Sequence, residues 1–272
     1  MHSTLQDTMT RLNTGLMIPR IGFGTWKLAE GGEAYDAVSA ALAQGYRLID
    51  TAAIYGNEES VGRAVRESGI PRDEIFITTK VWKSDMGHAR TKAAYENSLK
   101  RLGLDYVDLY LIHWPSSEEW KEAWQAMEEL YREERVKNIG VSNFTVDDLE
   151  QLHDIAHLVP AVNQIELHPF NYKHQKATLE YCREKGIIVE AYSPLTQSVW
   201  MDHAVINKLA ELHDKTPAQI LLRWSIQHDA VPIPKSSKPR HMQSNLDIFD
   251  FVLSEAEMVE LNKLGGDMSV MH

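Results

Sequence analysis

The stretch RLIDTAAIYGNEESVG, residues 47–62, sets the pattern that the rest of the chain repeats. A short apolar run at Leu48 and Ile49 ends in Asp50, and a small-residue loop then carries Tyr55. Apolar residues return after the loop at helical spacing, at Val61, Ala64 and Val65. This order predicts a strand, a loop and a helix, with an acid at the end of the strand and a phenol on the loop.

Similar apolar runs recur along the chain, and helical patterns separate them at roughly even spacing. The run at residues 107–113 is apolar nearly throughout, which is typical of a strand that is buried on both faces. We find no linker or break in composition, so we expect one domain over residues 1–272. The pattern predicts eight strands, at residues 21–24, 48–50, 75–80, 107–113, 136–141, 162–166, 187–191 and 231–233.

Strands that alternate with helices predict parallel βαβ units. Eight such units, closed into a ring, form a single (β/α)8 TIM barrel, an α/β fold whose active site lies at the C-terminal ends of the strands. An open, doubly wound sheet is the alternative. Its dinucleotide-binding fingerprint is missing, because Lys27 stands where the third glycine should follow Gly22 and Gly24.

Other elements are expected around the barrel. Residues 11–18 predict a β-hairpin that turns at Asn13-Thr14-Gly15 and can plug one end of the ring. Two helices are predicted between the last two strands, and Thr216-Pro217-Ala218-Gln219 begins the second as a capping box with proline at the first helical position. Extra C-terminal helices are expected at residues 239–246 and from Ser254 to Leu264.

The composition limits the classes of partner and compartment. A net charge of −11 argues against nucleic-acid binding, which calls for a basic surface. The single cysteine, Cys182, excludes an intramolecular disulfide and fits a reducing compartment. Residues 1–10 carry no apolar segment typical of a secretory signal, and no apolar run is long enough to span a membrane. We therefore expect a cytoplasmic protein, and we expect it to be a monomer.

Four ionisable side chains are predicted to share the rim of the barrel. Asp50, Lys80 and His113 all end strands, and Tyr55 follows the second strand. A free tyrosine has a pKa of about 10, and a nearby ammonium should lower that pKa. Asp50 would keep Lys80 charged away from water, since a lone buried charge is costly. His113 could then orient a carbonyl oxygen while Tyr55 protonates it.

Each of these residues also has an ordinary interpretation. A lysine or an aspartate at a strand end commonly forms a simple salt bridge. Tyr55 alone could be a packed loop aromatic, and His113 alone a core histidine. Their coincidence at four positions of one rim favours catalysis.

The segments around these residues, DTAAIYGNE, ITTKVW and LYLIHWP, resemble the catalytic tetrad segments of the aldo-keto reductase superfamily. The resemblance continues through residues 140–144, 163–169, 192–195 and 233–236, so it covers nearly the whole chain in order. It is closest to the small bacterial members similar to 2,5-diketo-D-gluconate reductase, because the connection after Pro115 and the tail past Gly266 are short. It implies an NAD(P)H-dependent reductase of aldehydes and ketones, with Asp50, Tyr55, Lys80 and His113 as the catalytic residues.

The resemblance also implies how NADPH or NADP+ binds without a Rossmann fingerprint. Ser142, Asn143 and Gln164 match positions that hold the nicotinamide carboxamide, and Tyr192 matches the ring that stacks on the nicotinamide. Late barrel loops and an extra helix N-terminus make physical sense as an anion site for the phosphates. The implied cofactor site comprises Gly24, Thr25, Trp26, Asp50, Ser142, Asn143, Gln164, Tyr192, Ser193, Pro194, Leu195, Lys235, Ser236, Ser237, Lys238, His241 and Asn245.

One position departs from the family pattern. Many members place an arginine six residues after the lysine that matches Lys235, against the 2′-phosphate of NADPH, but this chain has His241 there. Loss of a charge-assisted contact costs roughly 1.5–3 kcal/mol, or about one to two decades of affinity. We therefore expect a modest preference for NADPH and usable activity with NADH.

Aromatic side chains are expected to line the substrate mouth. Aromatic walls suit small aldehydes, dicarbonyl compounds and keto sugars. Trp200 follows the seventh strand, and its contact with substrate stays open. The expected substrate-binding residues are Trp26, Tyr55, Trp82, His113 and Trp114.

Two other functions compete with a reductase. A metal-dependent barrel hydrolase could use Asp50, His113, Glu166 and His168 as ligands, but no short paired spacing supports this and Lys80 would crowd a cation. A regulatory barrel could bind the nucleotide without turnover, although a pure binder has no need for an acid. We therefore expect no metal ligands.

Overall fold

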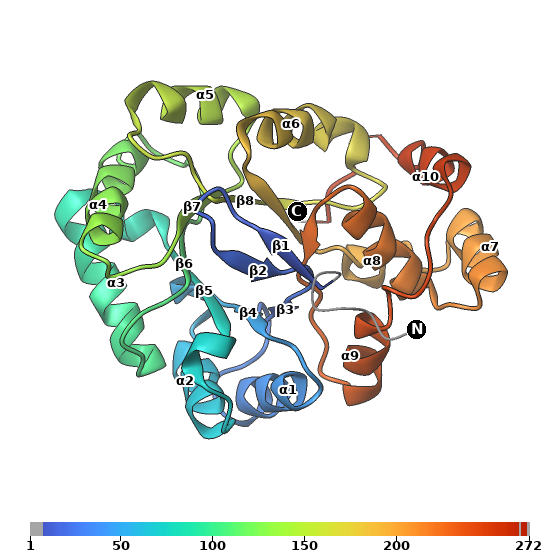
Figure 1. Cartoon of the computed structure of the whole chain (residues 1–272), viewed down its shortest axis with the longest axis horizontal. Helices are drawn as coiled ribbons and strands as arrows, with labels where there is room; N and C mark the ends of the chain where they lie inside the picture. Colours follow the sequence, from blue (N-terminus) through green and yellow to red (C-terminus); the bar gives the residue numbers. More distant parts are fainter. Residues whose placement is uncertain (1–7, 267, 271–272) are drawn as a thin grey trace.

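Eight parallel strands form the centre of the computed structural model, which describes residues 8–266 and 268–270. They lie side by side in chain order from β3 to β10, and helices surround them (Figure 1). The strands are β3 (Phe23–Gly24), β4 (Leu48–Asp50), β5 (Phe76–Val81), β6 (Leu109–Ile112), β7 (Ile139–Ser142), β8 (Val162–Glu166), β9 (Ile188–Tyr192) and β10 (Val231–Pro232). The helices are α1 (Gly32–Ala43), α2 (Glu58–Glu67), α3 (His88–Leu102), α4 (Trp120–Arg132), α5 (Val146–Ile155), α6 (Tyr172–Lys185), α7 (Ala204–His213), α8 (Pro217–Gln227), α9 (Pro239–Leu246) and α10 (Glu255–Asn262).

The first and last strands meet, so the sheet closes on itself. The Gly22 backbone N–H donates to the Pro232 carbonyl at 2.9 Å, and the Gly24 N–H donates to the Pro234 carbonyl at 3.1 Å. Glycine is required at this seam, because a Cβ on Gly24 would lie 2.8 Å from the Ile233 carbonyl oxygen. The predicted (β/α)8 barrel is therefore confirmed.

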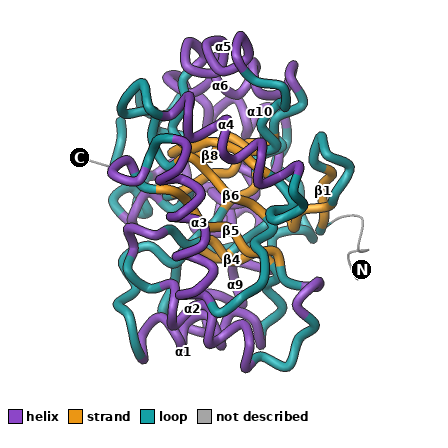
Figure 2. The backbone as a smooth tube through the Cα atoms, turned by 90° about the vertical axis from the view of Figure 1, so that its left-hand side faces the viewer, coloured by secondary structure: helices purple, strands orange, loops and turns teal. Residues whose placement is uncertain are grey.

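The predicted N-terminal hairpin is also confirmed, as β1 (Met9–Arg11) paired antiparallel with β2 (Met17–Pro19). Asn13 Nδ2 donates to the Pro160 carbonyl, and Thr14 Oγ1 donates to Asn138 Oδ1. Pro160 and Asn138 precede β8 and β7, so the hairpin covers the N-terminal ends of the strands. Figure 2 shows β1 on one flank of the barrel and the end of the described chain on the other. The hairpin therefore does not cover the C-terminal ends of the strands, where an active site is expected.

Local signals placed the helix starts well. Capping boxes begin α5 at Thr145, α8 at Thr216 and α10 at Ser254, as the sequence predicts. The last helix ends at Asn262, two residues before the expected Leu264. No helix in the described part of the chain is both long and apolar enough to cross a membrane.

Candidate active site at the C-terminal ends of the strands

Neighbouring parallel strands carry the four predicted catalytic side chains to one rim. Asp50 is the last residue of β4, Lys80 lies one residue before the end of β5, and His113 directly follows β6. Tyr55 ends the short 3₁₀ helix η2 (Ala53–Tyr55) after β4. Because these strands pair in parallel register, their C-terminal ends lie at the same edge of the barrel.

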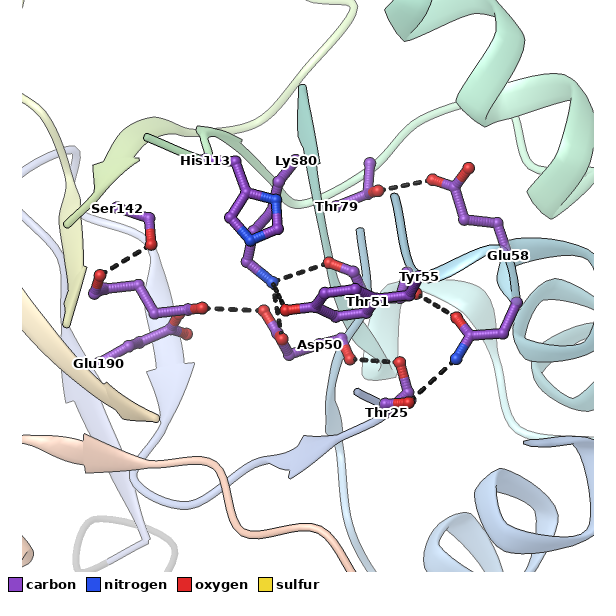
Figure 3. Close-up of polar contacts among 12 residues, drawn as sticks. Thr25, Asp50, Thr51, Tyr55, Glu58, Thr79, Lys80, His113, Ser142 and Glu190 are labelled. Atoms are coloured by element: carbon purple, nitrogen blue, oxygen red, sulfur yellow. Dashed lines mark hydrogen bonds and ion pairs between the residues drawn. The ribbon is translucent and has the colours of Figure 1, made fainter. Parts of the chain in front are cut away.

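The Lys80 ammonium lies at the centre of this group (Figure 3). Its Nζ donates to Asp50 Oδ1 at 2.8 Å, to the Thr51 carbonyl at 2.9 Å and to the Tyr55 hydroxyl at 3.3 Å. The Lys80 side chain is completely buried, so these three acceptors replace water around the charge. Burial alone would lower the pKa of Lys80, but the Asp50 carboxylate, followed by the Tyr55 hydroxyl group, outweighs it and raises that pKa. Lys80 therefore stays an ammonium at neutral pH.

The pKa of Tyr55 differs in direction from the sequence expectation. Lys80 lowers that pKa, as expected, but burial is the larger effect and Asp50 adds to it, so the pKa of Tyr55 is raised above 10.0. The expectation of a net decrease was wrong, because the sequence does not show how deeply the phenol is desolvated. The hydroxyl stays protonated at neutral pH, as a proton donor must.

His113 is neutral in this site. Burial is the main cause, and the nearby Lys80 charge adds to it, so the pKa of His113 falls to about 2. The imidazole packs edge-on against the rings of Tyr55 and Trp82, with centroids 5.7 and 5.1 Å away. A neutral imidazole carries one N–H and one acceptor nitrogen, so it can donate a hydrogen bond without contributing charge.

An asparagine that the sequence analysis missed fixes the loop that carries Tyr55. Asn57 is buried; its Nδ2 donates to the carbonyls of Thr25 and Leu28, and its Oδ1 accepts from Thr51 Oγ1. These bonds fasten the loop after β4 to the loop after β3. In the sequence, Gly56-Asn57 gives only the signal of a turn.

A cavity of about 710 Å³ opens above the four residues. All five predicted substrate residues line it, namely Trp26, Tyr55, Trp82, His113 and Trp114. Trp200 does not; its ring stacks on Phe170 with a centroid separation of 4.6 Å. Residues that the sequence analysis did not select also line the cavity: Lys27, Ile54, Gln197, Ser198, Ile233 and Pro234.

The predicted cofactor residues divide into two groups. The group that lines the cavity comprises Gly24, Trp26, Asp50, Ser142, Asn143, Gln164, Tyr192, Ser193, Pro194, Leu195 and Lys235. Of the others, Thr25 is buried, and its hydroxyl donates to the Asp50 carbonyl. Ser236, Ser237, Lys238 and His241 follow the cavity along the loop and first turn of α9, whereas Asn245 is a buried residue in the last turn of that helix.

Hydrogen bonds hold the polar groups of the cavity wall in fixed orientations. Gln164 Nε2 donates to Asp50 Oδ2 and to Glu190 Oε2, each at 2.8 Å, which leaves Gln164 Oε1 available to a ligand. The Tyr192 hydroxyl donates to Asn143 Oδ1 at 2.8 Å. Asn143 Nδ2 in turn donates to the His113 carbonyl at 3.0 Å. These contacts fix the Tyr192 ring, the two amides and the backbone beside His113 relative to one another.

The ligands considered for a metal-dependent hydrolase are engaged elsewhere. Asp50 is paired with Lys80, and Glu166 is 3.0 Å from His168 Nε2 and accepts from Ser269 Oγ and the Val270 N–H. Within residues 8–266 and 268–270, no three histidine, cysteine or acidic side chains gather in a way that could hold a metal ion.

Similarity to known proteins identifies the family of this chain. The model of the Aldo/keto reductase family matches residues 20–265. The chain belongs to the aldo/keto reductase family. Glyoxal reductase of Bacillus subtilis is 48% identical over 270 residues, which is 99% of this chain and 97% of that protein. The 9,11-endoperoxide prostaglandin H2 reductase of Trypanosoma cruzi is 43% identical, covering 95% of this chain and 92% of that protein.

Solved structures of aldo-keto reductases have the same fold. An enzyme from a deep-sea metagenome library is 44% identical, with a TM-score of 0.92 and 97% of each chain covered. An aldo-keto reductase of Bombyx mori, solved in complex with NADP, is 34% identical, with a TM-score of 0.92, 97% of this chain and 94% of that chain covered. This chain is therefore an oxidoreductase of a family that reduces carbonyl compounds with nicotinamide cofactors.

Proposed function

We propose that the protein is an NADPH-dependent reductase of aldehydes and ketones in which Tyr55 is the general acid. One observation carries the proposal: the Tyr55 hydroxyl lies 3.3 Å from a fully buried ammonium, in the wall of a cavity of about 710 Å³. An ammonium in this position stabilises the phenolate that forms as the proton leaves.

The residues present fit the nicotinamide end of such a cofactor. Gln164 Oε1 is left as an acceptor for the carboxamide N–H groups, because both hydrogens of the Gln164 amide are already engaged. The Tyr192 ring, held by Asn143, offers a flat surface on which the nicotinamide can stack. Lys235, Lys238 and Arg240 supply positive charge near the N-terminus of α9, where the adenosine phosphates would bind. A bound nicotinamide nucleotide supplies the hydride to the carbonyl carbon.

Each catalytic side chain then has a defined task. The neutral His113 donates a hydrogen bond to the carbonyl oxygen and orients it. Tyr55 gives its phenolic proton to the same oxygen as the carbon is reduced, so the product is the alcohol and Tyr55 is left as phenolate. Lys80 holds that phenolate, and Asp50 keeps Lys80 charged.

The substrate and cofactor preferences follow from the cavity and from α9. The name of the Bacillus relative and the aromatic cavity wall support small aldehydes, dicarbonyl compounds such as glyoxal, and keto sugars. The NADP complex of the Bombyx relative supports NADPH, and His241 supports usable activity with NADH. We further propose a cytoplasmic monomer that folds as one domain over residues 1–272.

The test is turnover with defined substrates. We expect a panel of aldehydes, dicarbonyls and keto sugars to cause loss of the absorbance of reduced nicotinamide, with either NADPH or NADH. Nucleotide binding without absorbance loss in a single turnover, with every carbonyl class tried, would instead support a regulatory barrel.

A further inference from the structure

Glu190 is a second carboxyl group inside the barrel, next to the catalytic cluster, and the mechanism above gives it no task. It lies on β9 and is 0% exposed. Its Oε2 accepts a hydrogen bond from Gln164 Nε2 at 2.8 Å, and the same nitrogen donates to Asp50 Oδ2. Its Oε1 is buried and has no hydrogen-bond partner among residues 8–266 and 268–270. A buried polar atom without a partner calls for an explanation.

The charges around Glu190 do not balance if both carboxyl groups are ionised. The charged groups that face it are Asp50 from β4 and Lys80 from β5, and Gln164 from β8 is neutral. Lys80 is already paired with Asp50, so one ammonium would have to compensate two carboxylates. The pKa of Glu190 is raised to about 8, mainly by burial and secondly by repulsion from Asp50.

We propose that Glu190 is a positioning residue that serves the catalytic cluster in its neutral form and that its ionisation weakens the support Lys80 gives to the Tyr55 phenolate. In the neutral form the proton sits on Oε1. A proton on Oε2 would point at Gln164 Nε2, and an amide nitrogen donates hydrogen bonds but does not accept them. Loss of this proton adds a negative charge beside Asp50. That charge makes a phenolate at Tyr55 less favourable without touching substrate.

This inference rests on the proposed function and makes a prediction about the direction of the reaction. In alcohol oxidation the Tyr55 phenolate takes the hydroxyl proton of the alcohol while hydride passes to the oxidised nicotinamide. The rate therefore depends on the fraction of Tyr55 that is ionised. Ionised Glu190 lowers that fraction at any pH below the pKa of Tyr55.

The first experiment compares Glu190→Gln with the wild type in alcohol oxidation between pH 6 and pH 9. Glutamine keeps an acceptor for Gln164 and mimics the neutral carboxyl. We expect equal kcat at pH 6, and a variant that is roughly 10- to 100-fold faster at pH 9, for a charge separation of about 6–12 Å at an effective dielectric near 20. A ratio of variant to wild type that stays constant from pH 6 to pH 9 would overturn the inference.

The matched control is Glu128→Gln. Glu128 is also buried, but it lies on α4 and accepts from Trp124 Nε1 and the His157 and Leu158 N–H groups. We expect its ratio to the wild type to stay constant with pH. A ratio that rises with pH in this control as well would mean that the Glu190 result does not come from the catalytic cluster, and the inference would fail.

A second experiment does not depend on activity. Infrared difference spectra, wild type minus Glu190→Gln, should show a protonated carboxyl near pH 6 that converts to carboxylate as the pH passes about 8. A carboxylate signal already at pH 6 would overturn the inference whatever the activity. A protonated carboxyl in a protein that reduces no carbonyl compound would instead refute the proposed function.

Stability gives the same information by linkage. The ordinary pKa of a glutamate is 4.5, so the unfolded chain releases the Glu190 proton at lower pH than the native protein does. The wild type therefore loses stability relative to Glu190→Gln as pH rises from about 4.5 to 8. We expect the Tm difference between the two proteins to grow by several degrees across this range. A Tm difference that does not change with pH would count against a neutral Glu190.

Discussion

The two halves of the barrel interior share strands β4, β5 and β8 but differ in chemistry. The half near the hairpin is apolar, and we call it the lower layer; it comprises Leu12, Ile18, Leu48, Phe76, Leu109, Leu111, Ala161, Val162 and Val231. The upper layer comprises Asp50, Lys80, His113, Gln164 and Glu190. Two residues along a strand separate the layers on one face, as from Leu48 to Asp50 or from Val162 to Gln164.

This difference shows how the fold supports charged groups without water. The lower layer and the hairpin cover one end of the barrel, and the cavity beside the upper layer opens at the other end. In such surroundings a hydrogen bond to an ion is strong and an unpaired ion is costly. The chemistry therefore depends on a layer that takes no part in it.

The largest expected effect comes from removing Tyr55, the proposed general acid, whose hydroxyl accepts a hydrogen bond from Lys80 of the upper layer. Tyr55→Phe should lower kcat for carbonyl reduction by roughly 10²–10⁴-fold, the usual contribution of a general acid, with little change in nucleotide affinity. Steady-state kinetics and tryptophan fluorescence titration check the two parts. The matched variant is Tyr95→Phe, which loses a buried hydroxyl that donates to the Arg135 carbonyl, far from the cavity. It should keep kcat within about twofold. Normal reduction by Tyr55→Phe would end the proposed mechanism.

A substitution in the lower layer should change stability and leave the chemistry intact. Leu111 is 0% exposed and lies two residues before His113 on β6. Leu111→Ala should cost about 2–5 kcal/mol of unfolding free energy, through lost burial and the cavity that remains. Denaturant unfolding measures this cost, and kcat per folded molecule should stay within about twofold. A large fall in kcat in a folded variant would show that the two layers are not separable.

Beyond the upper layer, the charge on α9 should set cofactor preference. His241→Arg should raise the ratio of kcat/KM for NADPH over NADH by about 10- to 100-fold, because a charge-assisted contact to the 2′-phosphate is gained. In the wild type we expect a ratio below roughly a thousand. His153→Arg, which adds the same charge on the exposed side of α5, is the control and should leave the ratio unchanged. An unchanged ratio in His241→Arg would show that the residue at position 241 does not determine the preference between NADPH and NADH.

The smallest expected effect is that of pH on kcat/KM, because His113 in the upper layer should not titrate near neutral pH. Because the pKa of His113 is lowered to about 2, the imidazole is charged only under strongly acidic conditions. The kcat/KM for carbonyl reduction should vary by less than about twofold between pH 5.5 and pH 7.5. The contrary result is a fall in kcat/KM on acidification within this range that is absent in His113→Asn. It would mean that His113 is more exposed to water, and its pKa higher, than the geometry of the site indicates.

The sequence by itself determined the order of strands and helices and the residues that would meet at the rim. Periodicity, capping boxes and strand ends are local features, so Thr145, Thr216 and the end of β4 could be predicted from neighbouring residues, and the ends of β5 and β6 to within one residue. The resemblance to the family added the positions of the cofactor site along the chain. The predicted ends of most strands differed from the observed ends by one to three residues.

Only the tertiary structure decided how far each ionisable group is removed from water and which distant groups lie beside it. The raised pKa of Tyr55 comes from burial by residues scattered through the chain, and it reverses the expectation based on Lys80 alone. Glu190, Lys27 and Gln197 gave no local signal, because their positions depend on how the barrel closes. Desolvation is a long-range property of packing, whereas helices and strands are specified largely by patterns within a few residues.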